Sequence, residues 1–141
     1  MATWDLERTR AHILICNGSS CLRQQGEEVT LAIRKALKEK SLDDVIHTTR
    51  TRCNGRCKDA PTVIVYPEGT WYQQVFPEDA EVLVSAICKG EQLREKVSHA
   101  FSGSGFHRYN DAPIGIRKSE NGKKPPDCLK SQHYKRGGIV P

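Results

Sequence analysis

The 141-residue sequence contains no apolar stretch that approaches the roughly 20 residues of a membrane helix. A secretory signal is also missing: acidic Asp5 and Glu7 precede the first apolar run, at residues 12–16. That run is shorter than the apolar core of about 7–15 residues that such signals carry. We therefore expect a cytoplasmic protein that does not bind membranes.

The sequence also lacks the common signatures of catalysis. It shows no glycine-rich phosphate loop, no recognisable nucleophile–base pair and no paired carboxylates in a known motif. The length allows about one ordinary domain, with no room for a separate flavin or nicotinamide domain beside it. These absences predict a protein that is not a stand-alone enzyme.

Residues 1–101 have no excess charge, because they contain fourteen Lys/Arg and fourteen Asp/Glu. The net charge of +5 arises in residues 102–141, where eight basic residues face three acidic ones. This segment is rich in Gly, Pro and Lys and has no apolar periodicity, so we expect a flexible basic tail. It shows no aromatic interleaving and no nucleic-acid-binding motif, which favours a solvated tail or a docking arm for a partner protein.

Four of the six cysteines form two close pairs, Cys16/Cys21 and Cys53/Cys57. Six cysteines in a secreted chain would suggest disulfides, but thiols stay reduced in the cytosol, where grouped cysteines more often bind metal or do redox chemistry. Cys88 falls on the apolar side of an expected helix and is interpreted as a small core residue. Cys128 lies in the basic tail and is interpreted as an incidental thiol.

Apolar periodicity over residues 12–88 indicates a compact α/β unit. Strands are expected at 12–15, 45–52, 62–66 and 70–76, with helices after the first strand, from about residue 26, and after Pro77. One more amphipathic helix is expected at 91–101, because Leu93 and Val97 are four residues apart. Both cysteine pairs fall in loops that leave strand ends, where binding residues are often found.

The pattern C-x4-C, a gap of 31 residues and C-x3-C admits three interpretations. A structural zinc site is compatible with the spacing. A dithiol redox centre would need C-x-x-C, which this pattern does not contain. A [2Fe–2S] cluster needs two thiolates on each of two iron atoms, and two loops with two cysteines each can supply them.

Residues beside the cysteines fit a cluster best. Gly18 and Gly55 would let backbone amides approach the sulfurs without an intervening Cβ. Arg56 belongs to a group of basic residues near the cysteines that also includes Arg23, Arg50, Arg52 and Lys58. The charge of this group could stabilise a reduced, more anionic centre or attract an acidic partner. We therefore expect Gly18, Gly55 and Arg56 to surround the ligands directly.

These motifs resemble those of the thioredoxin-like [2Fe–2S] ferredoxin family, which shares its cluster domain with the small iron–sulfur subunit of NADH dehydrogenase. The resemblance rests on I-L-I-C-N-G-S-S-C, the helix from Gly26, C-N-G-R-C-K-D-A-P, V-I-V-Y-P and the Trp71–Tyr72 strand. The C-x4-C spacing is shorter than in the free-standing ferredoxins and matches the NADH dehydrogenase subunit. Similar short ferredoxins of bacilli occur beside cobalamin-biosynthesis enzymes.

The resemblance implies a thioredoxin-like fold, with a central mixed four-stranded sheet flanked by helices, over a domain of residues 1–101. It implies a [2Fe–2S] cofactor held by Cys16, Cys21, Cys53 and Cys57, and places Pro61 where such folds often carry a cis proline. The expected function is one-electron transfer to a redox partner enzyme, with cobalamin biosynthesis as its setting and homodimers as its expected assembly. The alternative is a non-redox adaptor, stabilised by zinc or a cluster, that assists assembly of a larger enzyme.

Overall fold

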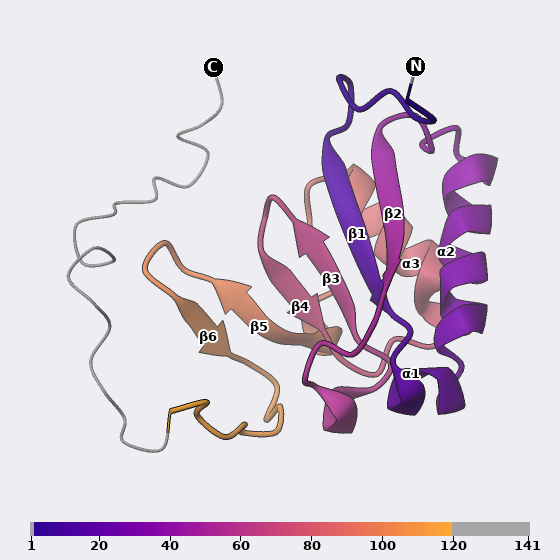
Figure 1. Ribbon diagram of the computed structural model, residues 1–141. Coiled ribbons are helices and arrows are strands. Elements are labelled where there is room, and N and C mark those ends of the chain that lie inside the picture. The colour runs from indigo at the N-terminus through magenta and orange to yellow at the C-terminus, as the bar shows by residue number, and fades with distance from the viewer. Residues whose placement is uncertain (1, 120–141) are drawn as a thin grey trace.

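The computed structural model describes residues 2–119, which form one sheet with helices packed on it (Figure 1). The sheet has the strand order β2-β1-β3-β4-β5-β6. Its strands are β1 (Ala11–Cys16), β2 (Ile46–Thr51), β3 (Val63–Tyr66), β4 (Thr70–Tyr72), β5 (Val97–Phe101) and β6 (Phe106–Arg108). The helices are α1 (Ser19–Arg23), α2 (Gly26–Glu39) and α3 (Ala80–Cys88), with short 3-10 helices η1 (Cys57–Asp59), η2 (Pro77–Asp79) and η3 (Arg94–Lys96).

Strands β1 and β2 run parallel, joined by the crossover through α1 and α2, and every other neighbouring pair is antiparallel. Alternate residues of the strands face α2 and α3, which lie on the same side of the sheet (Figure 1). The core between them includes Ile13, Ile15, Val63, Val65 and Tyr72, all almost completely buried. The mixed sheet flanked by helices confirms the predicted fold class.

Helix α2 forms where the sequence pattern predicts it. Val29, Ile33, Ala36 and Leu37 lie on one face and are buried against the sheet and α3. The spacing of i, i+4, i+7 and i+8 places these side chains on one stripe of a helix with 3.6 residues per turn. The packed stripe fixes the start of α2 directly after the first cysteine pair.

Two details of the prediction were wrong. The sheet has six strands rather than four, and residues 91–101 form η3 and strand β5 instead of an amphipathic helix. The four-residue spacing of Leu93 and Val97 suits a helix, but both side chains are buried in the core while the backbone of 97–101 pairs with β4. Sheet pairing therefore prevailed over local periodicity.

Part of the predicted tail belongs to the sheet. Strand β6 pairs with β5, and Ala112 is buried just beyond it. The remainder of that tail, residues 120–141 with Cys128, lies outside the described residues. No helix within residues 2–119 is long and apolar enough to cross a membrane.

The Ala60–Pro61 peptide bond is cis, as the resemblance to thioredoxin-like folds predicts. It precedes β3 and follows η1, so it lies between the second cysteine pair and the central strand. Tyr66–Pro67 is also cis, at the turn from β3 to β4.

Replacing Ile33 with Ala tests the packing of α2. The side chain is fully buried, so we expect the free energy of unfolding to fall by about 2–5 kcal/mol, from lost burial and the cavity left behind. Leu31→Ala, on the exposed side of the same helix, should change it by less than about 0.5 kcal/mol. Equal effects in chemical denaturation would contradict the assigned helix face.

Candidate metal centre

The parallel register of β1 and β2 brings the two cysteine pairs to one edge of the sheet. Cys16 ends β1 and is paired with Thr51, the last residue of β2. Parallel strands paired in this register end at the same edge of the sheet. Cys53 follows Thr51 by two residues, so it emerges from the sheet beside Cys16. Cys21 then lies on α1 and Cys57 begins η1. The sequence predicts the first pair in a loop, but a short helix carries its second cysteine.

All four cysteines line one small cavity, together with Gly18, Ser20 and Arg56. The thiols of Cys16 and Cys21 interact with each other, and the Sγ atoms of Cys53 and Cys57 are 3.7 Å apart. The cavity is therefore bordered by two sulfur pairs, one from each loop. The first pair is buried, with 3% and 2% exposure, whereas the second pair is exposed.

Hydrogen bonds and burial affect the buried thiols in opposite directions. Burial raises the pKa of Cys16, but hydrogen bonds from Gly18, Cys21 and Asn54 outweigh it and leave the pKa below its usual range. Burial, with the neighbouring Cys16, raises the pKa of Cys21 to about 11, although the backbone and hydroxyl of Thr62 oppose this shift. The same donors that favour a thiolate would also stabilise a sulfur bound to metal.

Gly18 and Gly55 have different structural roles. A Cβ on Gly18 would lie 2.8 Å from the Cα of Cys53, so only glycine allows the two ligand loops to approach this closely. Gly55 has a φ of +78°, which other residues rarely adopt, and its N–H donates to the Sγ of Cys53 over 3.3 Å. Since the backbone of Gly18 also donates to Cys16, the expected approach of a backbone amide to sulfur is present in both loops.

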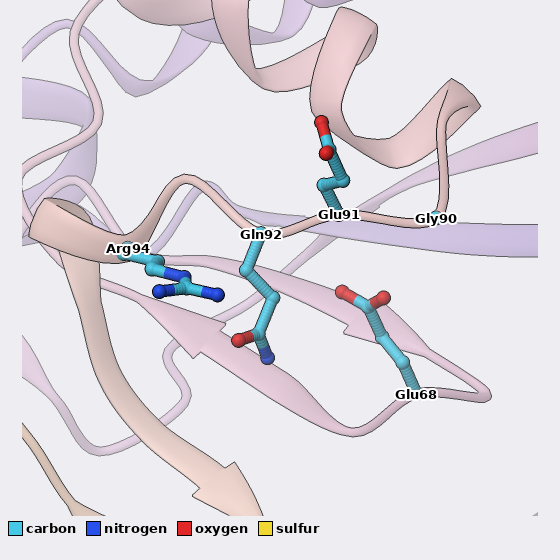
Figure 2. A pocket seen from close by; sticks show the side chains of 5 residues that line it. All are labelled: Glu68, Gly90, Glu91, Gln92 and Arg94. Atoms are coloured by element: carbon cyan, nitrogen blue, oxygen red, sulfur yellow. The ribbon is translucent and has the colours of Figure 1, made fainter.

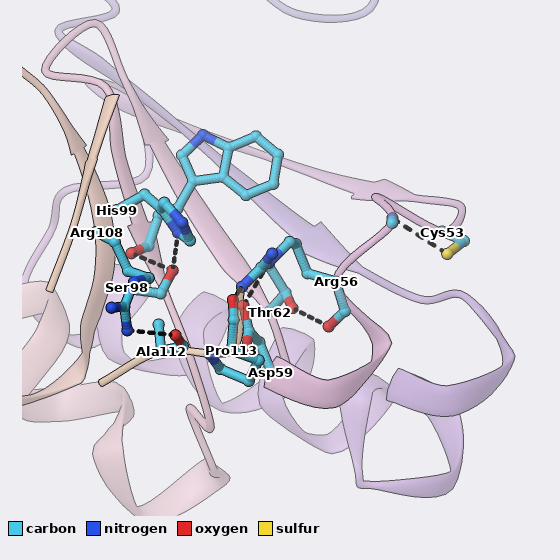
Figure 3. A network of polar contacts seen from close by, with 11 residues as sticks. Cys53, Arg56, Asp59, Thr62, Ser98, His99, Arg108, Ala112 and Pro113 are labelled. Atoms are coloured by element: carbon cyan, nitrogen blue, oxygen red, sulfur yellow. Dashed lines mark hydrogen bonds and ion pairs between the residues drawn. The ribbon is translucent and has the colours of Figure 1, made fainter. Parts of the chain in front are cut away.

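Arg56 borders the cavity, but its guanidinium is engaged by other groups (Figure 3). Its Nε lies 2.6 Å from Oδ2 of Asp59, a carboxylate that is 1% exposed, and its Nη2 donates to the carbonyl of Pro113 over 2.6 Å. A buried carboxylate needs such a partner, since an unpaired buried charge is costly. Arg56 thus ties the second ligand loop to residues that follow β6.

The other basic residues of the predicted group are either paired with a carboxylate or exposed. Arg50 makes two hydrogen bonds to Glu27, of 2.7 and 2.9 Å, which join β2 to the start of α2. Arg23, Arg52 and Lys58 are exposed around the ligand loops. The charge next to the exposed sulfur pair is therefore positive.

Sequence reasoning missed Asn54 and Thr62 as neighbours of the sulfurs. Asn54 reaches Cys16 from the opposite loop, and Thr62 reaches Cys21 from the residue before β3. Asn54 was visible inside C-N-G-R-C, but its sulfur partner depends on the folded loops. The sequence signal for Thr62 was its position directly after Pro61, the proline of the cis peptide bond.

The donor set fits a two-iron cluster. Within residues 2–119, no group of three or more His, Cys, Asp or Glu side chains is gathered around a single point. The four sulfurs instead border a cavity in two pairs, and a [2Fe–2S] cluster takes two thiolates on each of its two irons. N–H and O–H donors directed at the sulfurs complete a suitable environment for an anionic cluster.

A larger hollow lies elsewhere, between the turn before β4 and the segment after α3 (Figure 2). Its lining is polar, from Glu68, Gly90, Glu91, Gln92 and Arg94. Gln92 donates to the hydroxyl of Thr70 over 2.9 Å, which connects this segment to β4. None of the lining residues is a cysteine, so the hollow is separate from the candidate centre.

Comparison with known proteins points to one family. The model of the family described as thioredoxin-like [2Fe-2S] ferredoxin matches residues 5–88. A Priestia megaterium protein named "Putative 2Fe-2S ferredoxin" is 50% identical over 107 residues, covering 75% of this chain and 84% of its own. A 2Fe-2S ferredoxin of Clostridium pasteurianum is 33% identical over 92 residues, covering 59% of this chain and 90% of its own.

The fold also matches a solved structure. A thioredoxin-like [2Fe-2S] ferredoxin from Aquifex aeolicus superimposes with a TM-score of 0.62 at 28% sequence identity. The match covers 67% of this chain and 94% of that one. The remaining part of the chain lies outside this match.

Replacing Gly18 with Ala tests the contact between the ligand loops. Because the new methyl would clash with the backbone of Cys53, we expect a lower iron content and a lower melting temperature. Gly105→Ala is the matched control, since a Cβ there meets no atom within 4 Å. Iron analysis and thermal unfolding check this, and an unchanged iron content in Gly18→Ala would show that the loops need no such close approach.

Proposed function

The chain belongs to the thioredoxin-like [2Fe–2S] ferredoxin family, and on this premise we propose that its four clustered cysteines hold the cluster for one-electron transfer. Its cofactor is a [2Fe–2S] cluster. The proposed ligands are Cys16, Cys21, Cys53 and Cys57. The observation that carries this assignment is their position as two sulfur pairs around one cavity, one pair from β1 and α1 and the other from the segment after β2.

The cluster, when bound, supplies one-electron redox chemistry, and the protein supplies ligands, hydrogen bonds and a route to a partner. Four thiolates donate electron density strongly, so the proposed ligand set predicts a negative reduction potential. Asn54, Gly55 and Thr62 place donors near the sulfurs, where they offset the charge that reduction adds. This arrangement suits an electron carrier without a substrate of its own.

The proposed partner is a redox enzyme in the cytoplasm. A subunit of the NADH-quinone oxidoreductase of Rhizobium meliloti is 24% identical over 127 residues, covering 87% of this chain and 44% of its own. That relationship supports operation beside a larger oxidoreductase. A role in cobalamin biosynthesis and assembly as a homodimer are proposals that rest on the family resemblance.

Exchanging each ligand in turn for Ser tests the assignment. For Cys16→Ser, Cys21→Ser, Cys53→Ser and Cys57→Ser we expect loss of the cluster, or a changed absorption and electron paramagnetic resonance spectrum, because hydroxyl is a poorer iron ligand than thiolate. Cys88→Ser is the control, since Cys88 does not line the cavity and is exposed at the end of α3, so its predicted place in the core was wrong. The unmodified protein should contain about two iron and two acid-labile sulfide per chain.

A colourless, zinc-loaded protein from anaerobic purification would contradict electron transfer and favour the adaptor function. The ligand assignment itself would be wrong if any of the four variants kept an unchanged cluster spectrum.

Thr62→Val should make the reduction potential more negative while leaving the cluster in place. The substitution keeps the shape of the side chain but removes the hydroxyl, which lowers the pKa of Cys21 and also donates a weak hydrogen bond of 3.4 Å to the carbonyl of Arg56. Thr70→Val, at another buried threonine on β4, should leave the potential unchanged. Redox titration measures both variants, and an equal potential in Thr62→Val and the unmodified protein would refute a tuning role for this hydroxyl.

A further inference from the structure

We propose that Ile114 and Ile116, on the segment that Arg56 holds to the second ligand loop, form the docking surface for a redox protein with an acidic rim. This docking surface also includes two basic side chains of that loop, Arg52 and Lys58, and two of the segment itself, Arg117 and Lys118. The inference rests on the proposed function and adds where the partner binds and what chemistry its surface has.

The segment that carries the isoleucines is held against the second ligand loop. The carbonyl of Pro113 accepts a hydrogen bond of 2.6 Å from Nη2 of Arg56, and a Cβ on Gly115 would lie 3.2 Å from Nη1. Ala112 is buried, and its carbonyl accepts a hydrogen bond of 2.9 Å from Arg108. Residues 112–115 are thus anchored at both β6 and the loop of Cys57 (Figure 3).

The two isoleucines themselves are left without cover. Ile114 is 80% exposed and Ile116 is 98% exposed, on either side of the glycine that contacts Arg56. Two exposed isoleucines separated by one residue are more than a single scattered apolar residue on a surface. An apolar centre of this kind is typical of a protein interface.

The surroundings of the isoleucines are basic. Arg52 and Lys58 are exposed on the ligand loop, and Arg117 and Lys118 are exposed directly after Ile116. The carboxylate of Asp59 on the loop is buried and paired with Arg56, whereas Asp111, three residues before Ile114, is exposed. Four exposed basic side chains therefore face one exposed acidic side chain on the loop and the segment. A partner with an acidic rim is therefore the complementary one. Residues 120–141 contain five Lys/Arg and two Asp/Glu, a charge of the same sign as this surface.

The location also suits electron exchange. Cys53 and Cys57 are exposed while Cys16 and Cys21 are buried, so the second loop is the edge where a partner comes nearest to the centre. One electron leaves the reduced cofactor of this chain and enters the oxidised cofactor of the partner. No bond or proton is exchanged in that step.

Binding to oxidised flavodoxin, an acidic one-electron acceptor, tests the proposal on the full-length protein with its cluster. Calorimetry at low salt gives the dissociation constant, and stopped-flow mixing of reduced protein with flavodoxin gives the second-order rate constant. For the double variant Ile114→Ser/Ile116→Ser we expect binding at least about tenfold weaker, which corresponds to about 1.4 kcal/mol. Leu31→Ser, at an exposed leucine of α2, is the matched control and should stay within about twofold.

Charge reversal tests the basic rim separately. The double variant Lys58→Glu/Lys118→Glu should weaken flavodoxin binding at low salt, and high salt should remove the difference because it screens exposed charges. Lys35→Glu, on α2, is the control. Cytochrome c, a basic one-electron acceptor, should bind the unmodified protein more weakly than flavodoxin does.

The proposal would be overturned if the isoleucine variant and the Leu31 variant bound flavodoxin equally well. Tighter binding of cytochrome c than of flavodoxin would also overturn it. So would an isoleucine variant that changes from dimer to monomer while its flavodoxin binding stays unchanged. The last would assign the surface to a second copy of this chain. Iron, sulfide and reversible one-electron reduction are measured first in each preparation. Their absence from the unmodified protein refutes the proposed function, whereas their presence with unaltered docking refutes this surface alone.

Discussion

The parallel pairing of β1 with β2 is the constraint on which the candidate centre depends. It places the end of β1, at Cys16, level with Thr51, so that the loop of Cys53 begins beside the loop of Cys21. Helix α2 makes this pairing possible, because a parallel neighbour requires a crossover and the buried stripe of α2 holds that crossover on the sheet. Cysteines more than thirty residues apart in sequence thereby line one cavity.

The two sulfur pairs then differ in environment in a way that suits a carrier. The pair on β1 and α1 is buried and surrounded by donors from Gly18, Asn54 and Thr62. The pair in the second loop is exposed and bordered by basic side chains. A cluster held between them would have a protected inner side, where hydrogen bonds set its potential, and an accessible outer side, where a partner can approach.

The sequence was most informative where the signal was local. The paired cysteines, the stripe of α2 and the turn residues near the loops are all readable from spacing alone. The contacts of Asn54 and Thr62 with sulfur were missed because they join loops that only the fold brings together. Arg56 was read as a charge for the centre, but its guanidinium is paired with Asp59 and with the backbone of Pro113. The prediction of a helix at 91–101 was wrong because it used only the four-residue spacing of apolar residues. That spacing does not reveal that strand β4 lies beside this segment and offers partners for its backbone hydrogen bonds.

Iron X-ray absorption spectroscopy of the anaerobically purified protein tests the central claim most directly, because it reports which atoms surround the metal. Our account predicts iron coordinated by sulfur alone, with a second iron atom as the next scatterer, as two thiolate pairs around a [2Fe–2S] cluster require. Nitrogen or oxygen ligands, or iron without a second iron nearby, would contradict the assignment of these four cysteines.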